Sequence, residues 1–443
     1  METPIIDFVA GYADSETMRL HMPGHKGKTY LGPEKWDLTE VTGADSLYEA
    51  AGVIAQSEEN ASKLFGCKTF YSTEGSSHCI RAMLTLVTQY AAAQGKKPVI
   101  AAARNVHKSF LSAAAMLDVQ VSWLYPEAGE SYLSCTITPE RLDGFLQENA
   151  VTALYLTSPD YLGNVADVAR LAKICHDHDC LLLVDNAHGA YLRFLKPSLH
   201  PMDLGADLCC DSAHKTLPVL TGGAYLHVGE RVPMFAQQAK NALALHGSTS
   251  PSYLILQSLD MANRLLEELD FSAFCEKITA MRRRLEGKGL LFYGNEPMKL
   301  TLDGGKMGCG TGVLTWQLEE KGIEWEFADP DDLVLMPSPA MTDDELQQLE
   351  KALEELQTGN EEPNTLPEFS PCKQVMSMRQ AMLSPAETLP LDQCVGRVLA
   401  QPSVGCPPAV PIVICGEEID QHAVKLLRYY GTESCTVVLH QAE

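Results

Sequence analysis

The stretch LLLVDNAHGAY, residues 181–191, decides the fold of this chain. Its first residues, Leu181 to Val184, are apolar without alternation, which is typical of a strand buried on both faces. Such strands belong to parallel sheets, whose faces are covered by helices. The run ends in Asp185, at the carboxyl end of the expected strand, where open α/β sheets bind their ligands. The stretch therefore predicts an α/β fold with Asp185 at its ligand-binding edge.

A second stretch, DSAHK at 211–215, ends in Lys215, thirty positions after Asp185. The apolar segment 206–210 before it predicts a short strand, and the sequence TLP after it interrupts regular structure. Taken alone, this lysine is equally consistent with a solvated loop cation, because lysine side chains are mostly exposed. The spacing leaves room for one crossover and the next strand, so that Asp185 and Lys215 can face one crevice.

A carboxylate and an amine in this relation suit pyridoxal 5'-phosphate (PLP). The lysine can form a Schiff base with this cofactor. The carboxylate can keep the pyridine nitrogen protonated, so that the ring accepts electrons. The pair Asp185 and Lys215 therefore points to PLP as the cofactor.

Four motifs together resemble the ornithine/lysine/arginine decarboxylase family. They are RLHMPGHKG at 19–27, LLLVDNAHGAY at 181–191, DSAHKTLPVLTGGAYLHV at 211–228 and HGSTSPSY at 246–253. The resemblance extends from about Arg19 to Ile419. It implies PLP as cofactor and the aspartate-aminotransferase type of fold: an α/β protein with a three-layer large domain, a mainly parallel sheet and a smaller α+β C-terminal domain.

The chain divides by composition and by this resemblance. GNEEPNTLPEFSP at 359–371 is a polar, proline-bearing linker, and Thr342 with Glu345 predicts a capping box at a helix start. The expected parts are an N-terminal interface arm (1–56), a PLP-binding large domain (57–290), a small α/β domain (291–358), the linker (359–371) and a C-terminal domain (372–443).

The resemblance assigns catalytic roles to Lys215, Asp185, His107 and His188. His107 would stack on the cofactor ring and His188 would lie against the opposite face. A single histidine is more often structural than catalytic, so His107 depends on the family match. Ser76, Ser77, Ser212 and His214 would bind the phosphate, and Thr249 would reach the phosphate of a partner subunit. Without the resemblance, Ser76 and Ser77 would be an ordinary helix N-cap.

The chain departs from the family pattern at four positions. Glu74 and His78 flank the serines, where a Gly-Thr-Ser-type run is more common. Gly222 stands where glutamine is common, and Cys406 replaces a tyrosine before the paired prolines. These departures leave the substrate open among arginine, lysine and ornithine.

Composition narrows the classes of function. The net charge of −24 argues against a nucleic-acid partner, which requires a basic face. No apolar run approaches the ~20 residues of a membrane span, and the N-terminus lacks the features of a signal peptide. Fourteen scattered cysteines suggest reduced thiols in a cytoplasm. CHDHDC at 175–180 is no metal site, because consecutive helical positions face different ways.

These observations predict a cytoplasmic PLP-dependent decarboxylase that converts a basic amino acid to a polyamine-type amine and carbon dioxide. The expected assembly is a homodimer or larger oligomer with shared active sites, without nucleic acid, membrane or metal. Two alternatives remain open: another PLP enzyme of this fold (an aminotransferase or a lyase), and a catalytically silent regulatory homologue.

Overall fold

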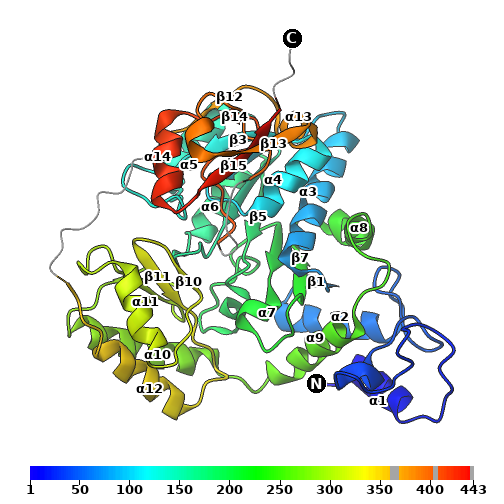
Figure 1. Cartoon of the computed structure of the whole chain (residues 1–443). Helices are drawn as coiled ribbons and strands as arrows, with labels where there is room; N and C mark the ends of the chain where they lie inside the picture. The colour runs from blue at the N-terminus through cyan, green and yellow to red at the C-terminus, as the bar shows by residue number, and fades with distance from the viewer. Residues whose placement is uncertain (360–368, 403–407, 440–443) are drawn as a thin grey trace. The chain divides into compact units, whose positions relative to one another are not determined.

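The computed structural model describes residues 1–359, 369–402 and 408–439. Most of the predicted linker and Cys406 lie outside these ranges. The described residues form two compact units. The first unit comprises Met1–Pro98, Leu142–Ser158 and Asp167–Phe271, and the second comprises Val99–Arg141, Pro159–Ala166 and the described part of Ser272–Glu443. Figure 1 shows the course of the chain, from blue at the N-terminus to red at the C-terminus.

The first unit contains the strands expected around Asp185 and Lys215. Their order is β1 (Lys68–Ser72), β7 (Ala224–Val228), β6 (Leu208–Asp211), β5 (Leu181–Asp185) and β4 (Ala153–Thr157). The strands β4, β5 and β6 run parallel, whereas β7 is antiparallel to both β6 and β1. The sheet is therefore mixed, with a parallel centre.

Both faces of this sheet are covered. Every residue of β5, β6 and β7 is buried, and successive side chains of a strand point to opposite faces. The helix α3 (Gly75–Ala93) packs against β6, β7 and α8 (Pro233–Ala244), and α6 (Val168–Asp177) packs against β5 (Figure 1). This burial confirms the predicted α/β fold.

The other elements of the first unit precede, connect or follow the sheet strands along the chain. They are α1 (Pro4–Ala13), η1 (Pro33–Trp36), α2 (Val53–Phe65), most of α5 (Pro139–Glu148), η2 (Ala190–Phe194), α7 (Ala213–Thr216) and α9 (Tyr253–Leu265). The helices α1, α2 and α9 pack together. Asp260 of α9 joins them, because its carboxylate accepts the amide hydrogens of Ile5 and Ile6 at 2.9 and 3.1 Å and the hydroxyl of Ser57 at 2.6 Å.

The sequence predicts one helix through 260–289, and this prediction is wrong. The structure ends α9 at Leu265 and begins α10 (Phe271–Glu286) six residues later. The amides of Glu267 and Glu268 donate to carbonyls three residues back, which tightens the last turn and ends the helix. Neither glycine nor proline marks this end, so no sequence signal revealed it.

The second unit contains a parallel strand pair and a separate antiparallel sheet. The pair β2 (Val99–Ala103) and β3 (Gln120–Leu124) is connected by α4 (Lys108–Leu117). The antiparallel sheet has the order β10 (Phe327–Ala328), β11 (Asp332–Leu335), β9 (Leu300–Asp303) and β8 (Phe292–Tyr293). Helices α11 (Thr311–Glu319) and α12 (Asp343–Glu354) follow in this region, and the predicted capping box of Thr342 and Glu345 is confirmed at the start of α12.

The C-terminal segment adds short elements with their own apolar core. They are β12 (Lys373–Gln374), α13 (Met378–Leu383), β13 (Ala386–Pro390), η3 (Leu391–Gln393), β14 (Glu417–Glu418), α14 (Gln421–Tyr429) and β15 (Ser434–Val438). Arg104, which follows β2, connects this segment to the rest of the second unit. Its guanidinium donates to the carbonyls of Pro411 and Ile412, each at 2.8 Å, and lies 3.5 Å from the buried carboxylate of Glu417.

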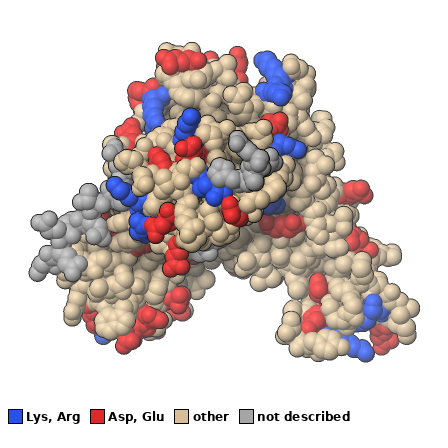
Figure 2. All heavy atoms as spheres, turned by 45° about the horizontal axis from the view of Figure 1, so that its top comes forward, with Lys and Arg blue, Asp and Glu red and all other residues tan. Residues whose placement is uncertain are grey.

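Acidic and basic side chains are interspersed on the face drawn in Figure 2. The net charge of −24 is therefore not gathered into a single patch on that face. Among the described residues, no helix combines the length and the apolar character needed to cross a membrane.

The Arg104–Glu417 pair is expected to be a principal stabilising contact of the second unit. Arg104→Met leaves the buried Glu417 without its cation and two carbonyls without their donor, so the free energy of unfolding should fall by about 3–5 kcal/mol, as measured by urea denaturation. Lys277→Met is the matched control: Lys277 pairs with Asp343 at 2.7 Å but is exposed, so its loss should cost at most about 1 kcal/mol. Equal effects of the two substitutions would contradict this prediction.

Candidate active site

Asp185 is a buried carboxylate at the carboxyl end of β5. Its side chain is 2% exposed. Its Oδ2 accepts the hydroxyl of Tyr155 at 3.1 Å, and its Oδ1 accepts the amide hydrogen of Ala187 at 3.3 Å. Burial raises the pKa of the Asp185 carboxyl, and the positive charge of Lys215 opposes this rise. The site therefore pairs a desolvated carboxyl with a nearby cation.

Lys215 lies in the single turn α7, directly after β6. Its Nζ is 2.9 Å from Nε2 of His188, a buried residue on the turn that follows β5. Because β5 and β6 are parallel neighbours with Asp185 opposite Cys210, their carboxyl ends bring these side chains to one edge of the sheet. The structure thus confirms the predicted placement of Asp185 and Lys215 at a shared edge; their chemical roles remain predictions.

Two of the predicted phosphate ligands meet at the start of α3. The hydroxyl of Ser212 donates to that of Ser76 at 2.7 Å, and Ser77 is the next residue of the helix. The first turn of a helix offers free amide hydrogens and the positive end of the helix dipole to an anion. These serines therefore stand where a phosphate can be bound.

His214, the fourth predicted phosphate ligand, precedes Lys215 in α7. Its Nδ1 donates to the carbonyl of Gly223 at 3.0 Å. Burial lowers the pKa of this imidazole, so His214 is expected to be neutral at pH 7. It can then offer a hydrogen bond to a phosphate but no full charge.

Three departures from the family pattern have local structural causes. Gly222 has a φ of 99°, and a Cβ there would lie 2.9 Å from the carbonyl oxygen of Thr73, so a glutamine would be strained. His78 is fully buried in α3, where its Nε2 lies 2.7 Å from the carbonyl of Leu243. Glu74 accepts the amide hydrogen of Ser248 at 2.6 Å and thereby anchors the loop that precedes Thr249.

His107 and Thr249, the remaining predicted site residues, lie on other elements of the chain. His107 belongs to the second unit, where it caps α4 and its Nδ1 accepts the amide hydrogen of Ser109 at 3.1 Å. Thr249 is exposed on the loop between α8 and α9 of the first unit. Cofactor stacking by His107 and a contact of Thr249 with a partner subunit remain predictions.

Whether PLP fits this edge can be judged from buried polar atoms that have no hydrogen-bond partner. The hydroxyls of Thr157 and Thr216 and the Oδ1 of Asn186 have no hydrogen-bond partner within the described part of the chain. Thr157 lies opposite Asp185 in the strand register, and Thr216 follows Lys215. Buried polar groups are nearly always satisfied, so a bound polar group at this edge fits the residues present.

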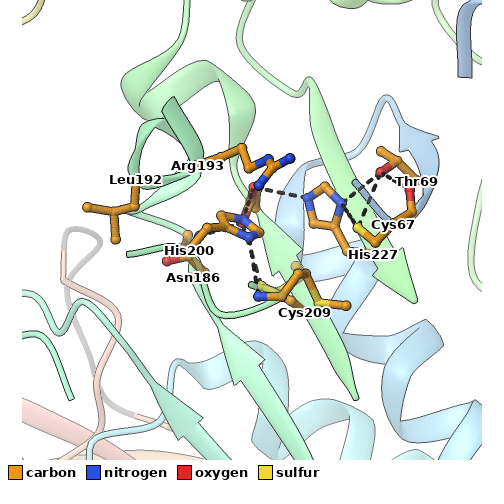
Figure 3. Close-up of polar contacts among 12 residues, drawn as sticks. Cys67, Thr69, Asn186, Leu192, Arg193, His200, Cys209 and His227 are labelled. Carbon is orange, nitrogen blue, oxygen red and sulfur yellow. Dashed lines mark hydrogen bonds and ion pairs between the residues drawn. The ribbon is translucent and has the colours of Figure 1, made fainter. Parts of the chain in front are cut away.

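Behind the edge, Asp211 holds a buried hydrogen-bond network (Figure 3). Its Oδ2 accepts from Nε2 of His200 and of His227 at 3.1 and 3.0 Å, and its Oδ1 accepts the amide of Asn186 at 2.7 Å. Burial alone would raise the pKa of Asp211, but the two imidazoles hold it well below its ordinary range. The ionised Asp211 therefore fixes the backbone directly before Ser212 and Lys215.

The same network offers a geometric alternative, a metal site. Ligand atoms of His200, Cys209 and Asp211 lie within 4.8 Å of one another. However, burial keeps the pKa of the Cys209 thiol far above its usual value, and that thiol donates to Asp211. His200 and Cys209 already bond the same carboxylate, that of Asp211, so we interpret the group as a hydrogen-bond network.

The histidines of CHDHDC each lie within hydrogen-bond distance of a carboxylate. Nε2 of His176 lies 3.0 Å from a carboxylate oxygen of Asp207, and Nε2 of His178 lies 2.8 Å from one of Asp143. Each ring thus has its own acidic partner, and the two rings serve different contacts.

Sequence reasoning missed Tyr155 and the role of Asp211. Tyr155 lies two residues before Thr157, which pairs with Asp185, so strand alignment could have placed it beside that carboxylate. Asp211 belongs to the DSAHK motif, but its partners His200 and His227 come from other segments. No local sequence pattern indicates that these two histidines bond Asp211.

The fold and this edge place the chain in a class of α/β enzymes. In this class, the ligand-binding edge of the sheet carries a lysine and a buried carboxylate that suit PLP. Within it, the chain belongs to the Orn/Lys/Arg decarboxylase family. The profile of the family's major domain matches residues 3–336, and that of its C-terminal domain matches residues 363–434. This membership confirms the predicted reaction class, decarboxylation of a basic amino acid.

Relatives and solved structures agree with this assignment. The arginine decarboxylases of Halalkalibacterium halodurans and Bacillus subtilis are each 29% identical over 96% of this chain and 93% of their own. Lysine decarboxylase A from Pseudomonas aeruginosa has a TM-score of 0.77 at 17% identity, covering 98% of this chain and 80% of its own. The Francisella novicida lysine decarboxylase has a TM-score of 0.75 at 17% identity, covering 99% and 81%. At this identity the structural likeness shows the fold.

Asp211→Asn tests the network by its pH dependence. The variant should lose about 3–5 kcal/mol of unfolding free energy at pH 7, because the two imidazoles lose their anionic acceptor. The wild-type carboxyl has a depressed folded pKa, so its stabilisation is present above the unfolded pKa of ~3.9 and is lost as the pH falls. Because the folded pKa lies well below ~3.9, the two proteins should converge only below about pH 4, and urea denaturation should be followed from pH 7.5 down to about pH 2.

The control for Asp211 is Asp143→Asn, which removes a more exposed carboxylate that also bonds a histidine, His178. Its effect should stay below about 1 kcal/mol. A constant difference between wild type and Asp211→Asn over the whole pH range would refute the ionised state assigned to Asp211.

Proposed function

We propose that this protein decarboxylates a basic amino acid with PLP bound at Lys215. The observation that carries this proposal is the placement of Lys215, 2.9 Å from His188, beside the strand that ends in the buried Asp185. Arginine is the proposed substrate. The arginine decarboxylases align over 96% of this chain, whereas a lysine decarboxylase from Pseudomonas aeruginosa aligns over 50%.

When bound, PLP supplies an electron sink that weakens the bond to the substrate carboxylate. Asp185 would hold a proton on the pyridine nitrogen, and the hydroxyl of Tyr155 keeps that carboxylate oriented. His188 is placed to accept a proton from Nζ of Lys215 and to return it. Proton transfer over this 2.9 Å contact would let Lys215 act first as a nucleophile and later as an acid.

The remaining predicted residues would hold the cofactor in place. Ser76, Ser77, Ser212 and His214 would bind the phosphate at the start of α3. His107 would pack on one face of the ring and His188 on the other. The bond from Ser109 to Nδ1 of His107 limits rotation of that imidazole, which suits a residue that packs flat on a ring.

We further propose a homodimer with shared active sites. The interface arm (1–56) carries large apolar side chains that are exposed in one chain, namely Met18, Leu20, Met22, Tyr30 and Leu31. Such clustered exposure is typical of an interaction surface. Contact with a second copy would cover these side chains and bring the exposed Thr249 loop to the partner's phosphate.

The sequence-based domain boundaries and the cytoplasmic location are also retained as proposals. The parts are 1–56, 57–290, 291–358, 359–371 and 372–443. Every described cysteine is a free thiol, which suits a reducing compartment. The amine product would be of the polyamine type.

The first test maps the cofactor and follows the reaction. Protein incubated with PLP and reduced with borohydride should carry the label on Lys215, and arginine should yield carbon dioxide and amine in equal amounts. Lys215→Ala should lose both, whereas Lys173→Ala, which removes an exposed lysine, should lose neither. Label on another lysine, or amino transfer to a keto acid in place of carbon dioxide release, would refute the proposal.

The second test asks whether two subunits share each site. Thr249→Ala should weaken PLP binding about ten- to a hundred-fold, because a charge-assisted hydrogen bond contributes roughly 1.5–3 kcal/mol. Ser250→Ala, one residue further on the same exposed loop, should leave binding unchanged.

Mixing then gives the decisive measurement. Lys215→Ala subunits combined with Thr249→Ala subunits should regain activity at limiting PLP, up to about half of the wild-type level. One of the two sites in each hybrid then receives both defects and the other receives neither. Hybrids that form and remain inactive would show that Thr249 acts within its own chain.

A further inference from the structure

The second unit contains a cavity with aromatic and acidic walls. Its volume is about 590 Å³. The walls include Tyr132, Trp325, Phe327, Asp329, Tyr429 and Tyr430. The ring centroids of Tyr132 and Tyr430 lie 4.5 Å apart, and those of Tyr429 and Tyr430 lie 5.1 Å apart. Several aromatic rings thus meet at one place, and the face of such a ring attracts cations.

Asp329 of the wall and its chain neighbours Asp331 and Asp332 have carboxyl oxygens that receive no hydrogen bond from the described residues. Asp329 lines the cavity, and Asp331 accepts the hydroxyl of the wall residue Tyr429 at 2.6 Å. Asp331 and Asp332 are only 7% and 2% exposed. Within the described ranges, Oδ2 of Asp329, Oδ2 of Asp331 and Oδ1 of Asp332 have no partner. A buried acceptor without a hydrogen bond lowers the stability of the folded protein. A donor from outside the chain would therefore stabilise these oxygens.

The local charge is unbalanced. The titratable groups that interact here are Asp303, Asp329, Asp331, Asp332, Lys306 and the tyrosines 132, 293, 429 and 430. Nζ of Lys306 lies 2.8 Å from Asp303, and the lysine side chain is 66% exposed. One solvated cation therefore faces four carboxyl groups.

The unbalanced charge changes the protonation of these acids. Burial raises the pKa of Asp329 to about 6. Burial, together with repulsion from the other carboxylates, raises that of Asp332 to about 9. These carboxyl groups therefore keep protons near neutral pH, and a bound cation would displace them.

We propose that this cavity binds an organic cation with an alkyl chain that ends in an ammonium or guanidinium group. The charged end would donate hydrogen bonds to the free oxygens of Asp329, Asp331 and Asp332 and lie against the tyrosine rings. The chain would pack on apolar wall residues such as Phe327 and Val410. A metal ion fits less well, because hard cations require six to eight oxygens. The inference uses residues of the second unit alone and is independent of the chemistry at Lys215.

Calorimetry with 1,4-diaminobutane on the full-length protein tests the site. The diamine should bind, whereas the neutral isostere 1,4-butanediol should not. Asp329→Asn should weaken binding about ten- to a hundred-fold, the effect of losing a charge-assisted hydrogen bond. Asp344→Asn, which removes an exposed carboxylate of α12, should bind like wild type. Equal binding of the diamine and the diol would overturn the proposal.

A second variant keeps the test decisive if Asp329→Asn fails to fold. Thr315, a half-buried wall residue, tolerates replacement more readily than a buried aspartate. Thr315→Arg places a guanidinium in the cavity and should abolish diamine binding while raising the melting temperature. Thr315→Met fills similar volume without charge and should weaken binding without that rise. Undiminished diamine binding in Thr315→Arg would place the ligand elsewhere and refute the site.

The pH dependence gives an independent readout. Because binding displaces protons from Asp329 and Asp332, diamine affinity should increase from pH 6 to pH 8, with proton release visible in buffers of different ionisation enthalpy. An affinity that is independent of pH, without proton release, would contradict the assignment of these carboxylates.

Discussion

The parallel pairing of β5 with β6 is the constraint on which the rest of the site depends. It sets Asp185 opposite Cys210, so that the turn carrying His188 and the turn carrying Lys215 leave the sheet at the same edge. Parallel neighbours require a crossover connection, which is why thirty residues separate two side chains that act in one place. The Ser76–Ser212 contact then joins the start of α3 to this edge.

Two buried aspartates on these strands are used in opposite ways. Tyr155, Ala187 and Cys210 donate to Asp185, but no imidazole does, and burial raises the pKa of this carboxyl. Asp211 receives hydrogen bonds from His200, His227 and Asn186, and remains ionised in spite of equal burial. The difference lies in the donors around each carboxylate, since both side chains are almost fully removed from water.

The Asp211 network supports the strand end from which the one-turn helix α7, with Lys215, leaves the sheet. Asn186 of the β5 turn donates to Asp211 of β6, and His227 of β7 donates to the same carboxylate. Three neighbouring segments are thereby cross-linked by hydrogen bonds, and Figure 3 shows Asn186 and His227 among the residues of this network.

Much of the fold could be predicted because its signals are local. The apolar run at Leu181–Val184, the capping residues of Thr342 and Glu345 and the turn glycines act over a few residues. The end of α9 escaped prediction because it depends on a tightened turn without glycine or proline. The buried partners Tyr155 and His200 were not predicted, because hydrogen bonds between segments that are distant in the sequence produce no periodic pattern in it.

By itself, the sequence determined the α/β class, the strand that ends in Asp185, the Lys215 motif and the family to which four separated motifs belong. Only the tertiary structure decided that His78 is a core residue, that Gly222 must lie against the carbonyl of Thr73 and that Asp211 anchors two histidines. The physical reason is that motifs record which chemical groups are present. Burial, register and the donors around each group decide which of them can exchange a proton and which must stay fixed.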